Sequence, residues 1–207
     1  MVNGSAADRE PELTTPQQWR DFLRDHGALF LRTANEYQRP YLDPEQVATG
    51  WMGRAAATEN SIAAAERRLG VRFPPTYRSF LLASDGWDGV GGWVSVVWPC
   101  AEIYWLRDSE SGQDLIEVYT EVEQETLEKQ GVAEPDEEKL SLLFGRALAV
   151  AEGEDFWLFD PTETGPNGEW PAYLFTPKYG ELEQFGSFSA LFHDDRRLLE
   201  QFAEMQR

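Results

Sequence analysis

The chain has 207 residues, of which 42% are hydrophobic and 13% aromatic, which is enough apolar material for the core of one domain. This composition excludes a globally disordered chain, and no apolar run approaches the roughly 20 residues of a membrane span. The formal net charge is −19, which disfavours nucleic acid and anionic lipid as partners because both are polyanions.

The negative charge is concentrated in the second half of the chain. Residues 1–107 carry 13 acids and 11 bases, whereas residues 108–207 carry 24 acids and 7 bases. Within residues 108–138, 12 acids accompany Lys129 as the only base. Such a run either solvates the protein or forms a surface that attracts a basic partner, and the sequence leaves both interpretations open.

Cysteine content and the first residues indicate the cellular compartment. Cys100 is the only cysteine, which excludes an internal disulfide framework and a four-cysteine zinc site. The first 15 residues lack the basic and apolar regions of a signal peptide. We therefore expect a soluble cytoplasmic protein.

The first third of the chain reads as a tail followed by a helical arm. Residues 1–15 are polar and are expected to be loose. Thr15 predicts an N-cap and Pro16 a first helical position, and apolar residues follow at helical spacing. Residues 28–37 either continue this helix or form a second one. Apolar residues within 40–53 indicate that the arm, residues 16–50, packs onto a domain formed by residues 51–207.

Two further helices are predicted before residue 87. Thr58 caps the first of them, and Gly70 ends it. Pro75 suits the first turn of the second, which buries one face. Gly86 is expected at a left-handed position just beyond this helix, with Asp85 as a helix-end residue. The apolar residues of the two helices are Ile62, Ala65, Leu69, Tyr77, Phe80 and Leu81.

The periodicity then changes to that of strands. Short aromatic or β-branched segments at 92–98, 103–106, 147–151, 156–160 and 170–175 predict strands joined by short connections. Residues 115–126 return to helical spacing, and Ser187 begins a final amphipathic helix. The sequence therefore predicts an α+β domain: an antiparallel sheet of about four to six strands, with helices before it and a C-terminal helix packed against one side or end.

The sequence contains no convincing nucleophilic or metal-binding constellation. Cys100 has no histidine neighbour in sequence, which favours a buried inert thiol. His26 and His193 each lie alone on a predicted helix, without the spacing of metal ligands. The run Gly89–Gly92 is not followed by Lys-Ser/Thr and favours a turn before a strand over a phosphate loop. No cofactor is expected.

Carboxylates are the remaining catalytic candidates. Glu152, Glu154, Asp155 and Asp160 cluster around a predicted hairpin, where they could serve a cation or a hydrolase. Acids at turns are commonly solvated, so the structural interpretation is favoured, and the hydrolase is kept as the weaker alternative.

One ordered motif has a family resemblance. The order of residues between 66 and 87 resembles the N-terminal signature of the SUKH superfamily. The residues that carry the resemblance are Glu66, Leu69-Gly70, Pro75, Tyr77, Phe80-Leu81 and Asp85-Gly86-Trp87. Residues 152–161 resemble the central hairpin of that family, and residues 185–192 resemble its closing strand-to-helix step. The resemblance covers about residues 50–205.

This resemblance implies an α+β binding domain without catalytic residues. Its members include a fungal cell-wall assembly regulator and, in bacteria, immunity proteins of polymorphic toxin systems. An intracellular immunity protein that neutralises a cognate basic toxin, such as a nuclease, is the favoured function, and a general regulatory adaptor is the alternative. The candidate partner contacts are Glu121, Glu123, Glu125, Glu128, Asp136, Glu137, Glu138 and, as aromatic anchors, Trp87 and Trp93.

Overall fold

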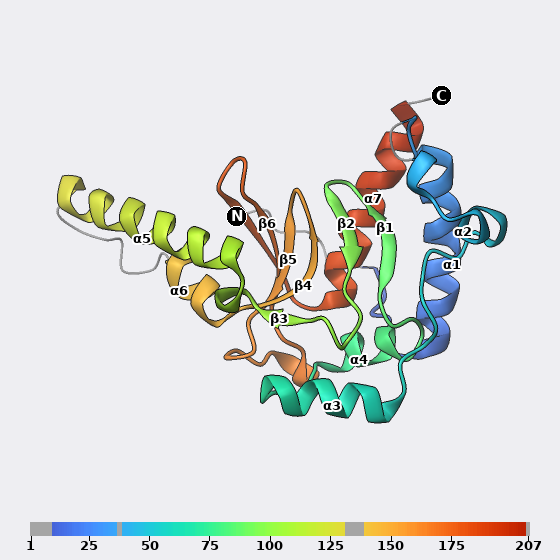
Figure 1. Cartoon of the computed structure of the whole chain (residues 1–207), viewed down its shortest axis with the longest axis horizontal. Helices are drawn as coiled ribbons and strands as arrows, with labels where there is room; N and C mark the ends of the chain where they lie inside the picture. The colour runs from blue at the N-terminus through green and yellow to red at the C-terminus, as the bar shows by residue number, and fades with distance from the viewer. Residues whose placement is uncertain (1–9, 37–38, 131–138, 206–207) are drawn as a thin grey trace.

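The computed structural model describes residues 10–36, 39–130 and 139–205. A seven-stranded antiparallel sheet forms its centre, and helices lie on both faces (Figure 1). The helices are α1 (Pro16–Thr33), α2 (Pro44–Thr49), α3 (Glu59–Leu69), α4 (Pro75–Leu81), α5 (Glu110–Gln130), α6 (Leu140–Arg146) and α7 (Phe188–Met205). The strands are β1 (Trp87–Gly91), β2 (Val94–Val97), β3 (Tyr104–Trp105), β4 (Leu148–Gly153), β5 (Phe156–Phe159), β6 (Ala172–Thr176) and β7 (Glu181–Phe185). The predicted α+β class is confirmed.

Helix α1 begins where the sequence predicts and runs on without a break. Thr15 caps it through a reciprocal bond with Gln18, and Trp19 is fully buried. Gly27 lies inside the helix and does not end it. A Cβ on Gly27 would lie 2.2 Å from the Gly50 carbonyl oxygen, so the glycine permits the chain after α2 to cross α1 closely.

Helices α3 and α4 also begin at their predicted residues. Thr58 caps α3 by accepting the Ser61 N–H, and Gly70 ends it with a φ of 73°. Pro75 occupies the first turn of α4, where its missing N–H costs no hydrogen bond. These local signals predict where both helices begin without reference to tertiary packing.

The strands pair in the order β1-β2-β4-β5-β6-β7, with β3 beside β4. The predicted hairpin between β4 and β5 is present, with Leu148 opposite Phe159. Two edge strands were not predicted from the periodicity of the sequence. Strand β1 contains Gly89 and Gly91, which weaken a strand pattern, and β7 (Glu181–Phe185) is largely polar and exposed. Pairing with β2 and β6 forms these strands in spite of their sequences.

The sheet separates two apolar cores. The larger contains Trp19, Tyr77, Trp157 and Phe188, and unites α1, α3, α4 and α7 with one sheet face. The smaller contains Leu143, Phe144, Ala149, Leu158 and Phe175, and joins α5 and α6 to the other face. The sequence predicts helices on one side or end of the sheet. Instead, α5 lies opposite the main helical layer, and its C-terminal half projects from the body (Figure 1).

Candidate protein-binding surface

The first half of the family-like motif ties two helices together. The Glu66 carboxylate accepts the Phe73 backbone N–H at 2.9 Å and an Arg78 N–H at 2.6 Å, which links α3 to α4. Tyr77 is fully buried, and its ring centroid lies 4.8 Å from that of Phe188 on α7. These residues hold the fold, as do the buried Leu69, Phe80 and Leu81.

The Asp85-Gly86-Trp87 end of the motif lies beyond α4, which corrects the prediction that it ends a helix. The Asp85 carboxylate accepts the Cys100 backbone N–H at 2.7 Å. Gly86 has a φ of 97°, and a Cβ there would lie 2.9 Å from the Val97 carbonyl oxygen. Trp87 begins β1 with no exposed surface. The motif therefore fastens β1 to β2 and the turn after it, and Trp87 is not available as an anchor for a partner.

The thiol and the imidazoles occupy structural positions. Burial raises the pKa of Cys100 to about 11, which keeps the thiol protonated at neutral pH. Burial lowers the pKa of His26 to about 4, and its Nε2–H is directed to the Val90 carbonyl oxygen. Burial also lowers the pKa of His193, whose Nε2 lies 3.2 Å from the Pro11 carbonyl oxygen. Neither imidazole has a nucleophile to activate among these contacts.

The carboxylates around the β4–β5 hairpin are held by separate neighbours. Asp160 is fully buried and accepts an Arg146 guanidinium N–H at 2.7 Å and the Thr162 backbone N–H at 2.9 Å. Asp155 accepts the Thr176 hydroxyl at 3.3 Å, and burial raises its pKa. Glu152 accepts the Tyr104 hydroxyl at 2.9 Å. Within residues 10–36, 39–130 and 139–205, no three His, Cys, Asp or Glu side chains gather closely enough to hold a metal ion.

Helix α5 presents a row of carboxylates to solvent. The row consists of exposed acids spaced three, four or seven positions apart, so that they share the outward face: Glu110, Asp114, Glu117, Glu121 and Glu128. Like charges at this spacing destabilise a helix by about 0.2–0.5 kcal/mol per pair. The carboxylate row is therefore unfavourable for α5 alone and becomes favourable beside cations.

The predicted contact residues on α5 divide into two kinds. Glu121, Glu125 and Glu128 are exposed, and Glu125 forms an ion pair with Lys129 at 2.8 Å. Glu123 instead points inward, where its carboxylate accepts the Ser141 backbone N–H at 3.0 Å and the Ser141 hydroxyl at 2.5 Å. It therefore caps the first turn of α6 and is not free to bind a partner. Asp136, Glu137 and Glu138 lie outside the described residues.

This capping role predicts a stability effect specific to Glu123. Replacing Glu123 by alanine leaves the first turn of α6 without its acceptor and its favourable negative charge. We expect the free energy of unfolding to fall by about 1 kcal/mol. Urea unfolding of Glu121→Ala, an exposed neighbour, is the control and should change by less than about 0.5 kcal/mol. Equal effects of the two substitutions would contradict the capping role.

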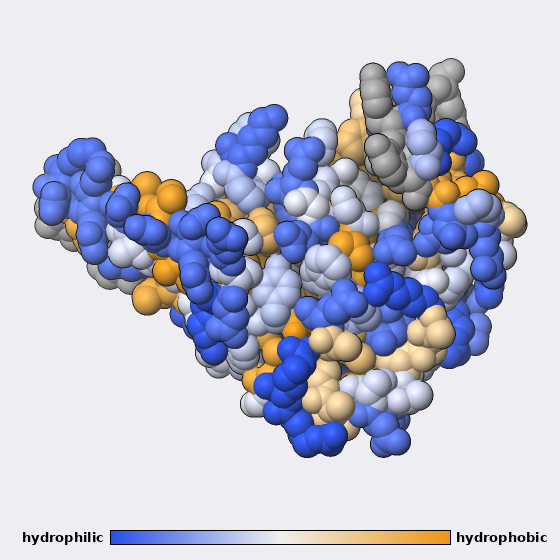
Figure 2. Space-filling view, viewed as in Figure 1, coloured by the Kyte–Doolittle hydropathy of each residue, from blue (hydrophilic) through white to orange (hydrophobic). Residues whose placement is uncertain are grey.

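Apolar side chains lie beside the carboxylate row. Val118 and Val122, one turn apart on α5, are 53% exposed each, and Leu142 on α6 is 60% exposed. Figure 2 shows apolar residues among the hydrophilic ones where α5 and α6 project from the body. The helical spacing predicts an apolar stripe of Leu115, Val118 or Tyr119, and Val122. Leu115 and Tyr119 do face the core, together with Ile116, whereas Val118 and Val122 do not. Trp93, at the β1–β2 turn, is 57% exposed, as an interface anchor requires.

Comparison with known proteins identifies the family. The model of the SMI1 / KNR4 family (SUKH-1) matches residues 56–194, which is more than half of the chain and spans α3, α4 and the whole sheet. No curated protein matches the chain significantly. In the part of the chain that the structure describes, no helix has the length and apolar content needed to cross a bilayer. The motif, the sheet and the match agree, and the chain belongs to the SMI1 / KNR4 family (SUKH-1).

Proposed function

We propose that this protein is a binding module that captures a basic protein partner on the outward face of α5, as an immunity protein captures a toxin. Membership of the SUKH-1 family fits an immunity protein or a regulatory module. The observation that carries the proposal is the carboxylate row of α5 with exposed Val118 and Val122 beside it.

The two components of this surface have different physical roles. A row of carboxylates attracts a basic partner over about a Debye length, roughly 8–10 Å at physiological salt, and speeds encounter. Apolar contacts that exclude water then slow dissociation. A nuclease toxin suits such a surface because it must be basic where it holds a polyanion. Occupying that region would block its substrate without any chemistry by the inhibitor.

The contacts of the candidate catalytic groups support a binding role. Asp160 is neutralised by Arg146, Cys100 is a buried thiol, and His26 is enclosed. The SUKH family is generally a non-catalytic binding domain. A binding surface therefore explains the exposed acids better than a hydrolytic pair does.

Charge reversal on α5 tests the proposal. The partner tested is the protein encoded beside this gene, and association is measured at low and high salt. We expect Glu117→Lys combined with Glu121→Lys to slow association at least about tenfold and to flatten its salt dependence. Glu163→Lys combined with Glu204→Lys makes the same charge change at exposed acids away from α5 and is the control.

A second pair of substitutions tests the apolar component. We expect Val118→Ser combined with Val122→Ser to speed dissociation while the association rate changes little. Equal binding by the α5 variants and the control would overturn the proposed surface. A complex that forms without relieving any toxicity of the partner would favour the regulatory adaptor over the immunity protein.

A further inference from the structure

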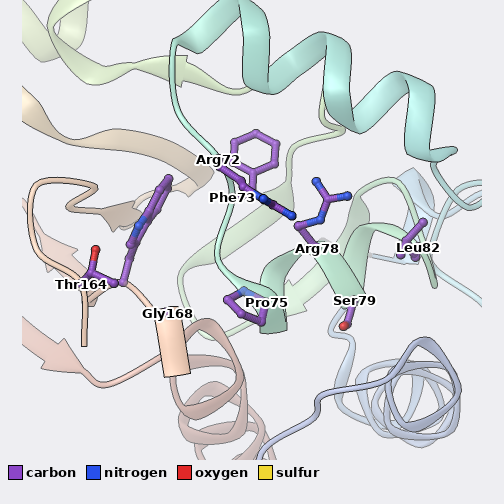
Figure 3. Close-up of a pocket in the computed structure, with 9 residues that line it drawn as sticks. Arg72, Phe73, Pro75, Arg78, Ser79, Leu82, Thr164 and Gly168 are labelled. Carbon is purple, nitrogen blue, oxygen red and sulfur yellow. The ribbon is translucent and has the colours of Figure 1, made fainter. Parts of the chain in front are cut away.

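A hollow of about 550 Å³ lies beside α4 (Figure 3). Helix α4 packs in the larger core, on the opposite face of the sheet from α5. Its walls come from the outer face of α4 (Pro75, Arg78 and Leu82), from the link before α4 (Arg72) and from the β5–β6 loop (Thr164 and Trp170). In Figure 3, Arg72 and Arg78 lie on one rim, and Thr164 and Gly168 lie on the facing side. The hollow is therefore separate from the carboxylate row.

The spacing of residues on α4 explains why this face is open. Tyr77, Phe80 and Leu81 point into the larger core. Pro75, Arg78 and Leu82 follow at intervals of three and four and share the opposite face. Trp170 closes the far wall with only 6% of its surface exposed. The hollow thus combines apolar walls with a polar rim, as peptide and ligand sites do.

Two arginines, Arg72 and Arg78, line the hollow in a chain whose net charge is −19. Glu59 and Glu66 hold the Arg78 guanidinium in place. Arg72 is exposed and, within the described residues, forms no hydrogen bond or ion pair. Its guanidinium is available for a carboxylate, which it can bind through two parallel N–H bonds.

We propose that this hollow is a second docking site, which takes a short acidic and apolar segment of a protein partner. An apolar side chain of the segment packs against Pro75, Leu82 and Trp170, and its carboxylate pairs with Arg72. A second copy of the chain is a poorer occupant. Two molecules of net charge −19 repel each other, and contact between α4 and a different surface would be head-to-tail and would not close a dimer.

Peptide selection tests this site. The probe is a random-sequence peptide library displayed against the full chain, followed by anisotropy measurements on the enriched peptides. We expect peptides in which Asp or Glu neighbours an aromatic residue or proline. Arg72→Ala should weaken their binding about tenfold or more, the loss expected for one charge-assisted bond. Arg67→Ala removes an exposed arginine of α3 that does not line the hollow and should leave affinity unchanged.

Two further controls test whether peptide binding depends on the Arg72–carboxylate pair and on this hollow alone. Changing the peptide acids to Asn or Gln should weaken binding as Arg72→Ala does, with no further loss when the two changes are combined. The α5 charge reversal should leave peptide binding unchanged. A failure of this proposal can therefore be distinguished from a failure of the proposed function. Failure to enrich acidic peptides, binding that survives Arg72→Ala, or self-association of the chain that requires Arg72 would each overturn the proposal.

Discussion

Replacing Trp87 by alanine is expected to lower the free energy of unfolding by about 3–5 kcal/mol, the cost of removing a large aromatic side chain from a packed core. Trp87 has no exposed surface, and the Trp51 ring meets it edge-on at 5.1 Å. A Cβ on Gly53 would lie 2.8 Å from the Trp87 ring, so the backbone at Gly53 packs directly against the indole. Because small domains are stable by only about 5–15 kcal/mol, the variant should unfold at a much lower urea concentration.

Trp93→Ala is the matched control because it removes the same side chain from the tip of the next turn. Trp93 is 57% exposed, so its loss should change the free energy of unfolding by less than about 0.5 kcal/mol. Both values come from urea unfolding followed by circular dichroism. Equal losses for the two tryptophans would show that Trp87 is not the core residue that the structure describes. An effect of Trp93→Ala on partner binding alone would place Trp93 in an interface.

Replacing Asp195 by asparagine is expected to stabilise the protein at alkaline pH. Asp195 lies on α7 beneath the β1–β2 turn, and Cβ atoms on Gly91 and Gly92 would lie 3.1 and 3.2 Å from its carboxylate oxygens. Its Oδ2 has no hydrogen-bond partner within the described residues. Burial, and to a lesser extent the charge of Asp194, raises the pKa of Asp195 to about 7. An ionised carboxylate is therefore unfavourable here.

The sign of the pH dependence follows from the two pKa values of Asp195. The folded state holds the proton up to about pH 7, whereas the unfolded state releases it near the ordinary aspartate pKa of 3.8. Stability is therefore lost as pH rises from 4 to 7, by on the order of 2–4 kcal/mol for this group. Asparagine should remove this loss, so that the variant gains stability over the wild type at pH 8 and little at pH 4.

His26 acts in the opposite direction and must be separated from Asp195. Its folded pKa of about 4 lies below its usual value of 6.5, so its contribution is present above pH 6.5 and is lost as pH falls to 4. The difference between wild type and Asp195→Asn cancels the His26 contribution, since both proteins contain it. Urea unfolding across this range gives that difference. A difference that does not grow with pH would refute the buried, unpaired state of Asp195.

The helices and the central hairpin were predictable because their signals are local. A cap at Thr15 or Thr58, a proline at the first turn and a glycine at the end act within a few residues of each helix. The β4–β5 hairpin has buried strands that are apolar in their own right. By contrast, β1 and β7 owe their existence to the strands beside them, and their own sequences give a weak signal.

The candidate surface was predictable only in part. The abundance of acids was evident, but whether a given acid faces solvent depends on which face of α5 meets α6. Glu121 and Glu123 are both glutamates two residues apart, yet one is exposed and the other caps α6. Val118 and Tyr119 were interchangeable in the helical pattern, and only packing against Phe144 and Phe175 selects Tyr119.

The sequence by itself determined the α+β class, the family resemblance, the starts of the main helices and the concentration of negative charge after residue 107. These properties follow from local backbone chemistry and from composition. Only the tertiary structure decided that α5 packs with α6 on the sheet face opposite the larger core, that Trp87 is enclosed while Trp93 is exposed, and that Arg72 faces a hollow. Burial and orientation depend on contacts between segments far apart in the chain, and no local pattern records those contacts.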